Sequence, residues 1–252
     1  MEFSILQAGL LFLAALIAGW IDAIAGGGGM ITLPSLLAVG LPPHLALGTN
    51  KLQSTFGSFT ATYSHVRRGV VNLRDAVWGI VATGVGAGLG ALVVQKLKSE
   101  LLEAVIPFLL LGLVIYFVLS PRLGERDSVA KMKPIPFFVG FGLLIGFYDG
   151  FFGPGTGSFW AMSFVMILGF NLVKATGYTK LMNFVSNIMS LLAFAIGGHV
   201  ALAIGLLMGI GQMIGAYIGS HLVITRGAKF VRPILVAVVL LTTAKLLYDN
   251  FK

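Results

Sequence analysis

The residues best placed to do chemistry lie around two glycine-rich breaks, at 26–29 and 153–157. Each break comes directly before a short apolar segment. A helix that begins there would present unpaired N–H groups and a partial positive charge, an arrangement that binds anions. Thr32 and Ser158 are candidate caps for these two helix starts. The alternative is that the glycines only permit a tight turn.

Two lysines occupy matching positions in the two halves of the chain. Lys51 and Lys180 each stand near the start of a long apolar segment. A charge inside a membrane segment is costly and usually faces a cavity or a partner. A lysine can instead extend outward to a lipid headgroup. Because the two positions match, we expect both lysines to supply positive charge to an anion site.

Two aspartates form a second matching pair. Asp22 and Asp149 each stand four residues before a glycine break. Three roles compete for them: counter-ion to Lys51 or Lys180, hydrogen-bond acceptor for the broken backbone, and proton carrier. We favour structural pairing.

Polar side chains around the lysines supply further hydrogen-bonding groups. On a helix, residues three or four apart share a face, so Thr179, Asn183 and Asn187 can converge on one ligand. Hydrogen bonding between helices would explain the two amides equally well. Asp22 and Asp149 join the candidate site in a structural or proton-coupling role. The predicted binding residues are Gly26, Gly27, Gly28, Gly29, Thr49, Asn50, Lys51, Gln53, Ser54, Gly153, Gly155, Thr156, Gly157, Thr179, Lys180, Asn183 and Asn187.

No stretch of the sequence forms a catalytic or metal-binding motif. The chain has no Cys, and its four His residues include no pair four apart, which argues against zinc. The glycine motifs of nucleotide-binding loops and of serine hydrolases do not occur. The sequence therefore predicts no catalytic residue, no metal and no cofactor.

The composition predicts a membrane protein. Hydrophobic residues make up 57% of the 252 residues and charged residues 10%, against about 25% charged residues in soluble domains. This excludes a water-soluble enzyme, a disordered chain and a nucleic-acid binder, and makes the lipid bilayer the expected partner. The net charge of +8 fits the excess of Lys and Arg in cytoplasmic loops.

Ten apolar segments are the predicted helices. A complete span needs about 20 residues, so 30–41 and 158–170 are too short and are expected to be half-spanning or re-entrant. The first segment looks like a signal peptide, but residues 1–4 contain no Lys or Arg, so we expect it in the mature protein. The segments are 5–25, 30–41, 45–64, 76–95, 101–120, 135–152, 158–170, 174–196, 200–224 and 232–249.

The chain contains an internal repeat. Residues 19–22 match 146–149 at an offset of 127, and 46–52 match 175–181 at an offset of 129. The second offset also relates two pairs of glycines, whose spacing of four suits close helix packing. These pairs are Gly86 with Gly90, and Gly215 with Gly219. The same spacing predicts close packing for Gly84 with Gly88, Gly205 with Gly209, and Gly211 with Gly215.

The basic residues predict how the two repeats are oriented. Loops 65–74, 121–134 and 225–232 carry most of them, so we place these loops in the cytoplasm. Loops 96–100 and 197–200 then lie outside. Loop 197–200 is the counterpart of 65–74 in the repeat, so the two halves are inverted with respect to each other.

The predicted fold class is an all-α integral membrane protein. It is a multi-pass helical bundle of two inverted repeats, 1–126 and 127–252. Each repeat contains a glycine-broken helical hairpin, re-entrant or half-spanning.

The motifs of both halves resemble those of the TauE/SafE family of membrane transporters. In the first half the resemblance lies in 18–29 (AGWIDAIAGGGG) followed by 47–51 (LGTNK). In the second half, 153–157 (GPGTG) and 179–180 (TK) are similar to the repeated family motif. The likeness spans essentially the whole chain.

This resemblance implies movement of sulfite or a small organosulfonate outward across the bacterial inner membrane. Pro154 and Tyr178 stand where the first half has Gly27 and Thr49, so the two half-sites need not bind equally. The alternatives are an anion channel, an importer of sulfate-like anions and, from a different class, an intramembrane hydrolase. A homo-oligomer is compatible with all of them.

Overall fold

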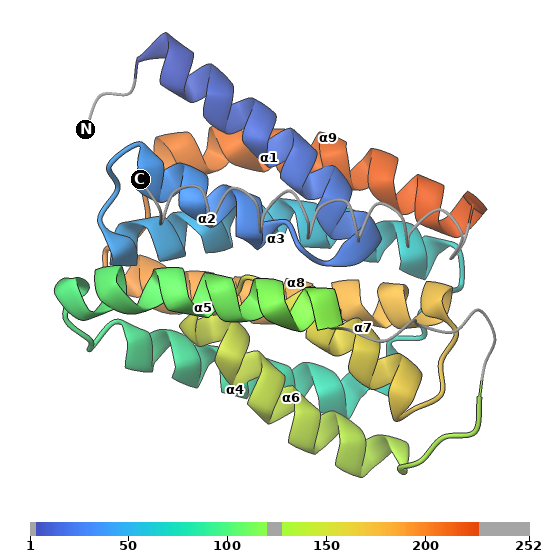
Figure 1. Cartoon of the computed structure of the whole chain (residues 1–252). Helices are drawn as coiled ribbons and strands as arrows, with labels where there is room; N and C mark the ends of the chain where they lie inside the picture. Colours follow the sequence, from blue (N-terminus) through green and yellow to red (C-terminus); the bar gives the residue numbers. More distant parts are fainter. Residues whose placement is uncertain (1–3, 120–127, 227–252) are drawn as a thin grey trace.

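The computed structural model describes residues 4–119 and 128–226, and every regular element in these two ranges is helical (Figure 1). Nine predicted segments coincide with α-helices, and the tenth, 232–249, lies outside the described residues together with most of loop 225–232. The elements are α1 (Ile5–Ala25), α2 (Gly29–Ala38), α3 (Pro43–Arg67), a short 3-10 helix η1 (Arg74–Ala76), α4 (Val77–Val94), α5 (Ser99–Leu119), α6 (Pro134–Phe151), α7 (Thr156–Met166), α8 (Leu172–Ile196) and α9 (Leu202–Arg226).

Two helices are short, as predicted. With 10 and 11 residues, α2 and α7 are each about 15 Å long, half of what a bilayer core requires. The expected caps are wrong, because Thr32 and Ser158 lie inside the first turn and neither helix has a side-chain hydrogen bond at its N-cap. Thr32 Oγ1 instead donates to Asn50 Oδ1 at 2.6 Å.

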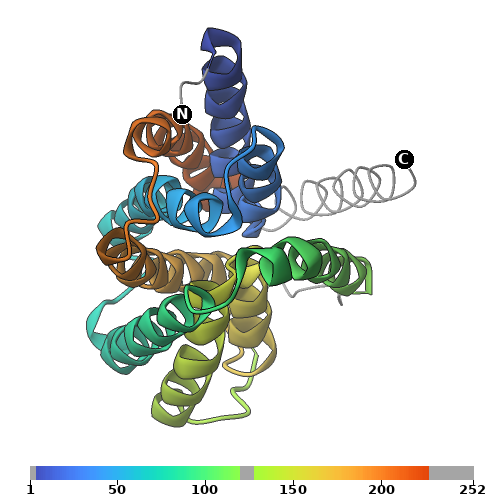
Figure 2. The same ribbon diagram turned by 90° about the vertical axis from the view of Figure 1, so that its left-hand side faces the viewer.

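The helices lie side by side, with α1 and α9 at one edge, α4 and α6 at the other, and α3 and α8 between them (Figures 1 and 2). Glycines bring each edge pair into backbone contact. A Cβ on Gly215 of α9 would lie 2.0 Å from the Leu16 carbonyl oxygen of α1. A Cβ on Gly86 of α4 would lie 2.4 Å from the Leu143 carbonyl oxygen of α6. In the sequence repeat Gly215 matches Gly86, and Leu16 matches Leu143. The first helix of each half, α1 or α6, therefore packs in the same way against a helix of the other half.

The connections that follow α3 and α8 lie at opposite ends of α3. Gly48, near the start of α3, packs against His199 in the connection between α8 and α9. His65, near the end of α3, packs against Gly177. These two connections occupy matching positions in the sequence repeat.

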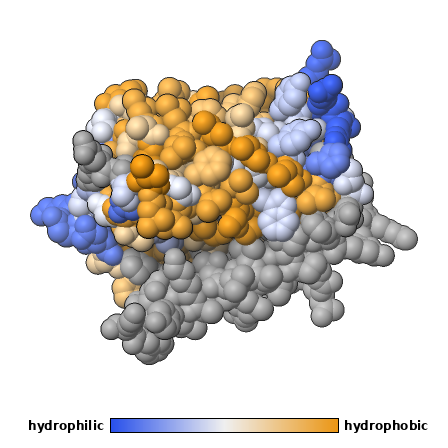
Figure 3. Space-filling view, turned by 90° about the horizontal axis from the view of Figure 1, so that it is seen from above, coloured by the Kyte–Doolittle hydropathy of each residue, from blue (hydrophilic) through white to orange (hydrophobic). Residues whose placement is uncertain are grey.

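The surface is suited to lipid. Five of the described helices, α1, α4, α6, α8 and α9, are long and apolar enough to cross a membrane. On α1, Leu6, Leu10 and Leu13 are 72%, 58% and 53% exposed, which water would not favour over a contiguous face. Figure 3 shows a broad hydrophobic band with hydrophilic residues towards its two ends. The α3 helix is equally long but more polar, and its polar residues are largely buried in the bundle.

Candidate functional site

The two glycine breaks meet in the middle of the molecule. Gly26 has φ +79°, and a Cβ there would lie 2.6 Å from the carbonyl carbon of Gly157. A Cβ on Gly157 would in turn lie 2.6 Å from Gly26 Cα. The backbone of one half therefore touches that of the other, and a side chain at either position would separate them.

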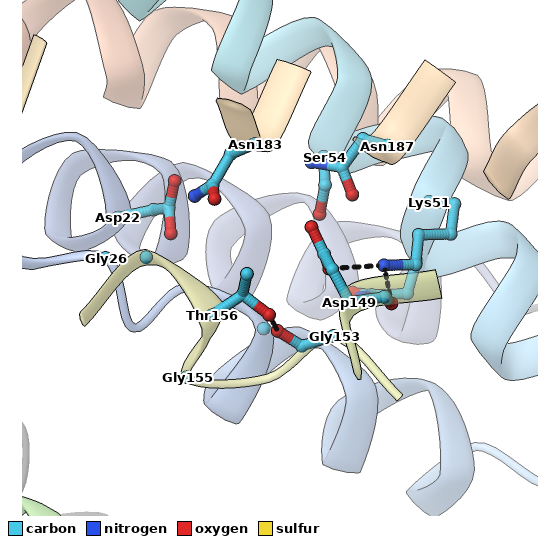
Figure 4. A pocket seen from close by; sticks show the side chains of 13 residues that line it. Asp22, Gly26, Lys51, Ser54, Asp149, Gly153, Gly155, Thr156, Asn183 and Asn187 are labelled. Atoms are coloured by element: carbon cyan, nitrogen blue, oxygen red, sulfur yellow. Dashed lines mark hydrogen bonds and ion pairs between the residues drawn. The ribbon is translucent and has the colours of Figure 1, made fainter. Parts of the chain in front are cut away.

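A small cavity lies between the breaks and the central helices (Figure 4). Its volume of about 30 Å³ has room for about two water molecules, so it favours a compact ligand. Every residue that lines it belongs to the set predicted from the sequence. The lining residues are Asp22, Gly26, Gly29, Asn50, Lys51, Ser54, Asp149, Gly153, Gly155, Thr156, Gly157, Asn183 and Asn187.

Lys51 reaches the cavity as half of a buried ion pair. Its Nζ lies 2.6 Å from Asp149 Oδ1 and 2.5 Å from the Asp149 carbonyl oxygen. The two side chains are 1% and 4% exposed. The carbonyl lies in the last turn of α6, where helix carbonyls lack an intrahelical partner and a cation is favourable. Lys51 thus closes the end of a helix of the other half.

Lys180 makes the equivalent contact with the first half. Its Nζ lies 3.0 Å from Asp22 Oδ2 and also donates to the Asp22 carbonyl oxygen, in the last turn of α1. Both lysine side chains are 1% exposed, so neither extends outward in the way a headgroup anchor would. Each aspartate is the counter-ion of the lysine in the opposite half.

The two lysines differ in their access to the cavity. Lys51 lines it and Lys180 does not, although Asp22, the partner of Lys180, does. The sequence predicts that both lysines supply positive charge to the anion site. Of these two lysines, Lys51 is the one among the residues that line the cavity.

The cavity also receives neutral hydrogen-bonding groups. Asn50 Oδ1 accepts from Thr32 Oγ1 and from Gln53 Nε2, which leaves the Asn50 amide N–H groups for another partner. The N-termini of α2 and α7 reach the cavity through Gly29 and Thr156, without a side-chain cap. Together with Lys51, these groups can hold an anion.

Six predicted residues lie around the cavity without lining it. Thr49 Oγ1 accepts a hydrogen bond from the Ala201 N–H just before α9. Gly28 donates its N–H to Asp22 Oδ1 at 3.2 Å and packs against Ala18, so its role is to position the break. The six are Gly27, Gly28, Thr49, Gln53, Thr179 and Lys180.

Two residues outside the predicted set hold the site in place. Ser186 donates a hydrogen bond to Asp149 Oδ2. The Tyr148 hydroxyl donates to the Pro154 carbonyl oxygen at 2.8 Å and so fixes the second break. Tyr148 matches Ile21 in the repeat, which has no hydroxyl, so a comparison of the two halves gave no indication of this contact.

Comparisons with known proteins agree on one family. The family model "Sulfite exporter TauE/SafE" matches residues 11–246. The "Probable membrane transporter protein YfcA" of Escherichia coli K12 is 49% identical over 242 residues, which are 96% of this chain and 90% of the relative.

Two further relatives extend across almost the whole chain. The "Probable membrane transporter protein ORF9" of a Sinorhizobium species is 48% identical, over 95% of this chain and 92% of the relative. A "Probable membrane transporter protein" of Haemophilus influenzae is 41% identical, over 99% and 98%. A comparison with solved structures finds no match. The chain therefore belongs to the TauE/SafE family and is a membrane transporter.

Proposed function

We propose that this transporter exports a small sulfur-containing oxyanion, sulfite or an organosulfonate, across the bacterial inner membrane. The cavity between the two breaks is the binding site. The two halves, 1–126 and 127–252, act as inverted repeats and expose the cavity to one side of the membrane at a time. The name of the matching family model supports the choice of cargo.

One observation carries this proposal. Two uncapped helix N-termini, from opposite halves of the chain, meet the Lys51 ammonium at a single cavity. Each of these features alone has a structural explanation, such as a turn or a helix cap. Their convergence on a space for a compact ligand favours the binding of an oxyanion.

The membrane potential suffices to drive export. With the cytoplasm negative, each negative charge that leaves gains about 2.3 kcal/mol per 100 mV. This corresponds to a concentration ratio of roughly fifty at 1.4 kcal/mol per decade. Import of a monoanion would need coupled cations to overcome the same energy.

Voltage-driven uptake of labelled sulfite into proteoliposomes tests the proposal. A potassium gradient with valinomycin makes the vesicle interior positive. We expect uptake to rise with this potential and to be absent from protein-free vesicles. A lack of potential-dependent sulfite uptake would contradict the proposed cargo. Unitary conductance steps in planar bilayers would instead identify an anion channel.

A further inference from the structure

One wall of the cavity offers a hydrogen-bond acceptor that nothing occupies. Asn183 is 6% exposed and lines the cavity, and its Oδ1 is buried without a hydrogen-bond partner among the residues that the structure describes. Its Nδ2 lies near Gly157, on the side of the Asp22 carboxylate (Figure 4). An amide nitrogen beside a carboxylate is the favourable orientation, so the oxygen is the atom left for a ligand. A buried acceptor without a partner is costly, and a ligand that carries a donor removes this cost.

The charges around the cavity point to the same kind of ligand. Two carboxylates, Asp22 and Asp149, line it, but only one ammonium, that of Lys51. Lys51 neutralises Asp149 and Lys180 neutralises Asp22, so the site has no net positive charge to balance the second charge of a dianion. Repulsion between like charges is strong in a partly dry site, so a monoanion is favoured over a dianion.

We propose that the substrate is a monoanion that also carries a hydrogen-bond donor, and that Asn183 Oδ1 accepts this hydrogen bond. The class includes hydrogen sulfite, the ligand nearest in size to the cavity, and sulfonates with a hydroxyl group, for which the cavity must widen when it opens to one side of the membrane. It excludes fully deprotonated dianions such as sulfate. The anionic oxygens lie against Lys51 and the helix N-termini, and the donor points to Asn183. This inference rests on the proposed function and narrows its cargo.

Competition between two sulfonates of nearly equal size tests it. Hydroxyethanesulfonate and propanesulfonate differ by a hydroxyl group in place of a methyl group. In the proteoliposome assay, hydroxyethanesulfonate should inhibit labelled sulfite uptake at a concentration at least about tenfold lower, since a site built for a hydroxyl rejects analogues that lack it. Sulfate should inhibit more weakly than hydroxyethanesulfonate.

Two asparagine variants assign the preference to one residue. Asn183→Leu should remove the difference between the two sulfonates. Asn187→Leu is the matched control, one helical turn further along α8, where the amide already donates to Ser58 Oγ at 3.5 Å. Asn187→Leu should still be inhibited more strongly by hydroxyethanesulfonate than by propanesulfonate, even if its rate of sulfite uptake falls.

The outcomes separate the two proposals. Sulfite uptake that both sulfonates inhibit equally, or that neither inhibits, overturns the inference about the donor and leaves the proposed function standing. A preference that survives in Asn183→Leu overturns the role of Asn183. If wild-type vesicles take up no sulfite, both proposals fall.

Discussion

The two lysines of the site are each bound to an aspartate of the opposite half. Because Lys51–Asp149 and Lys180–Asp22 are buried pairs, removing one partner leaves a charge without compensation. A loss of transport after such a change has two explanations, loss of binding and loss of stability. A second change in the same pair separates them.

Lys51→Met should lower the free energy of unfolding by about 3–5 kcal/mol, because it leaves the buried Asp149 unpaired. Adding Asp149→Asn removes this charge and should restore most of the thermal stability, measured as Tm in detergent. Sulfite uptake by the double variant should remain at least about tenfold below wild type, about 1.4 kcal/mol, because the cavity has lost its ammonium.

Lys180→Met with Asp22→Asn is the matched control, since it repairs the equivalent pair and leaves Lys51 in the cavity. It should retain more transport than the Lys51 double variant. Lys51→Arg should rescue only in part, because a planar guanidinium does not replace a compact ammonium. Wild-type transport by the Lys51 double variant would remove Lys51 from the site.

The sequence predicts which residues surround the cavity but not how they pair. Runs of glycine that break a helix and polar residues inside apolar segments are uncommon in the sequence. A prediction based on them includes every residue that lines the cavity. The repeat, however, allows Lys51 to pair with Asp22 of its own half or with Asp149 of the other. It also makes Lys51 and Lys180 equivalent, although only Lys51 of the two lines the cavity.

At the scale of helices, glycines determine how closely α4 can approach α6. Gly90 and Gly88 lie on the same helix with different surroundings. A Cβ on Gly90 would lie 2.1 Å from the Phe147 carbonyl oxygen, whereas a Cβ on Gly88 would have no described neighbouring atom within 4 Å. The spacing of four predicts close packing for Gly84 with Gly88 and for Gly86 with Gly90, and the second pair makes it. For Gly88 the prediction is wrong, because that position faces away from every described helix. Gly88 shows that glycine spacing alone does not identify the face in contact.

Gly90→Ala should therefore push α4 away from α6 and cost about 1–3 kcal/mol. For a protein of this size the Tm should fall by about 2–12 °C. Gly88→Ala on the same helix should leave the Tm unchanged or raise it slightly, because alanine is the better helix former. Equal Tm values for the two variants would show that the contact at Gly90 does not hold the helices together.

The positions of the helices follow from apolar length, which is why nine predicted segments match α-helices. Their ends depend on local contacts that a hydropathy pattern does not contain. The α2 helix begins at Gly29, before Thr32, because the Asp22 carboxylate binds the Gly28 N–H. Thr32 is then free to bind Asn50 instead of capping the helix.

For the whole molecule, the orientation of the two halves is the prediction most open to a direct test. The chain has no Cys, so single cysteines can be introduced at exposed sites. Arg68 follows α3, and Ile196, 89% exposed, ends α8. Gly198 is less suitable because its φ of +72° strains any side chain.

In intact cells, a membrane-impermeant maleimide should label Ile196→Cys and should not label Arg68→Cys. Opening the membrane should expose Arg68→Cys. This result follows if the basic loop 65–74 faces the cytoplasm and its counterpart 197–200 faces outward. Labelling of both positions from the same side would contradict the inverted arrangement.

The packing of α1 against α9 also affects how the protein is made. The ribosome completes α1 long before α9, which ends at Arg226. The length of about 200 residues between the ends of these two helices takes roughly 10–40 s to synthesise at about 5–20 residues per second. During this time the face of α1 around Leu16 has not yet met Gly215, and Asp22 lacks its final partner, Lys180. The first half is therefore an incomplete unit when it enters the membrane, and the newborn chain acquires its central cavity only after α8, up to Asn187, has been inserted.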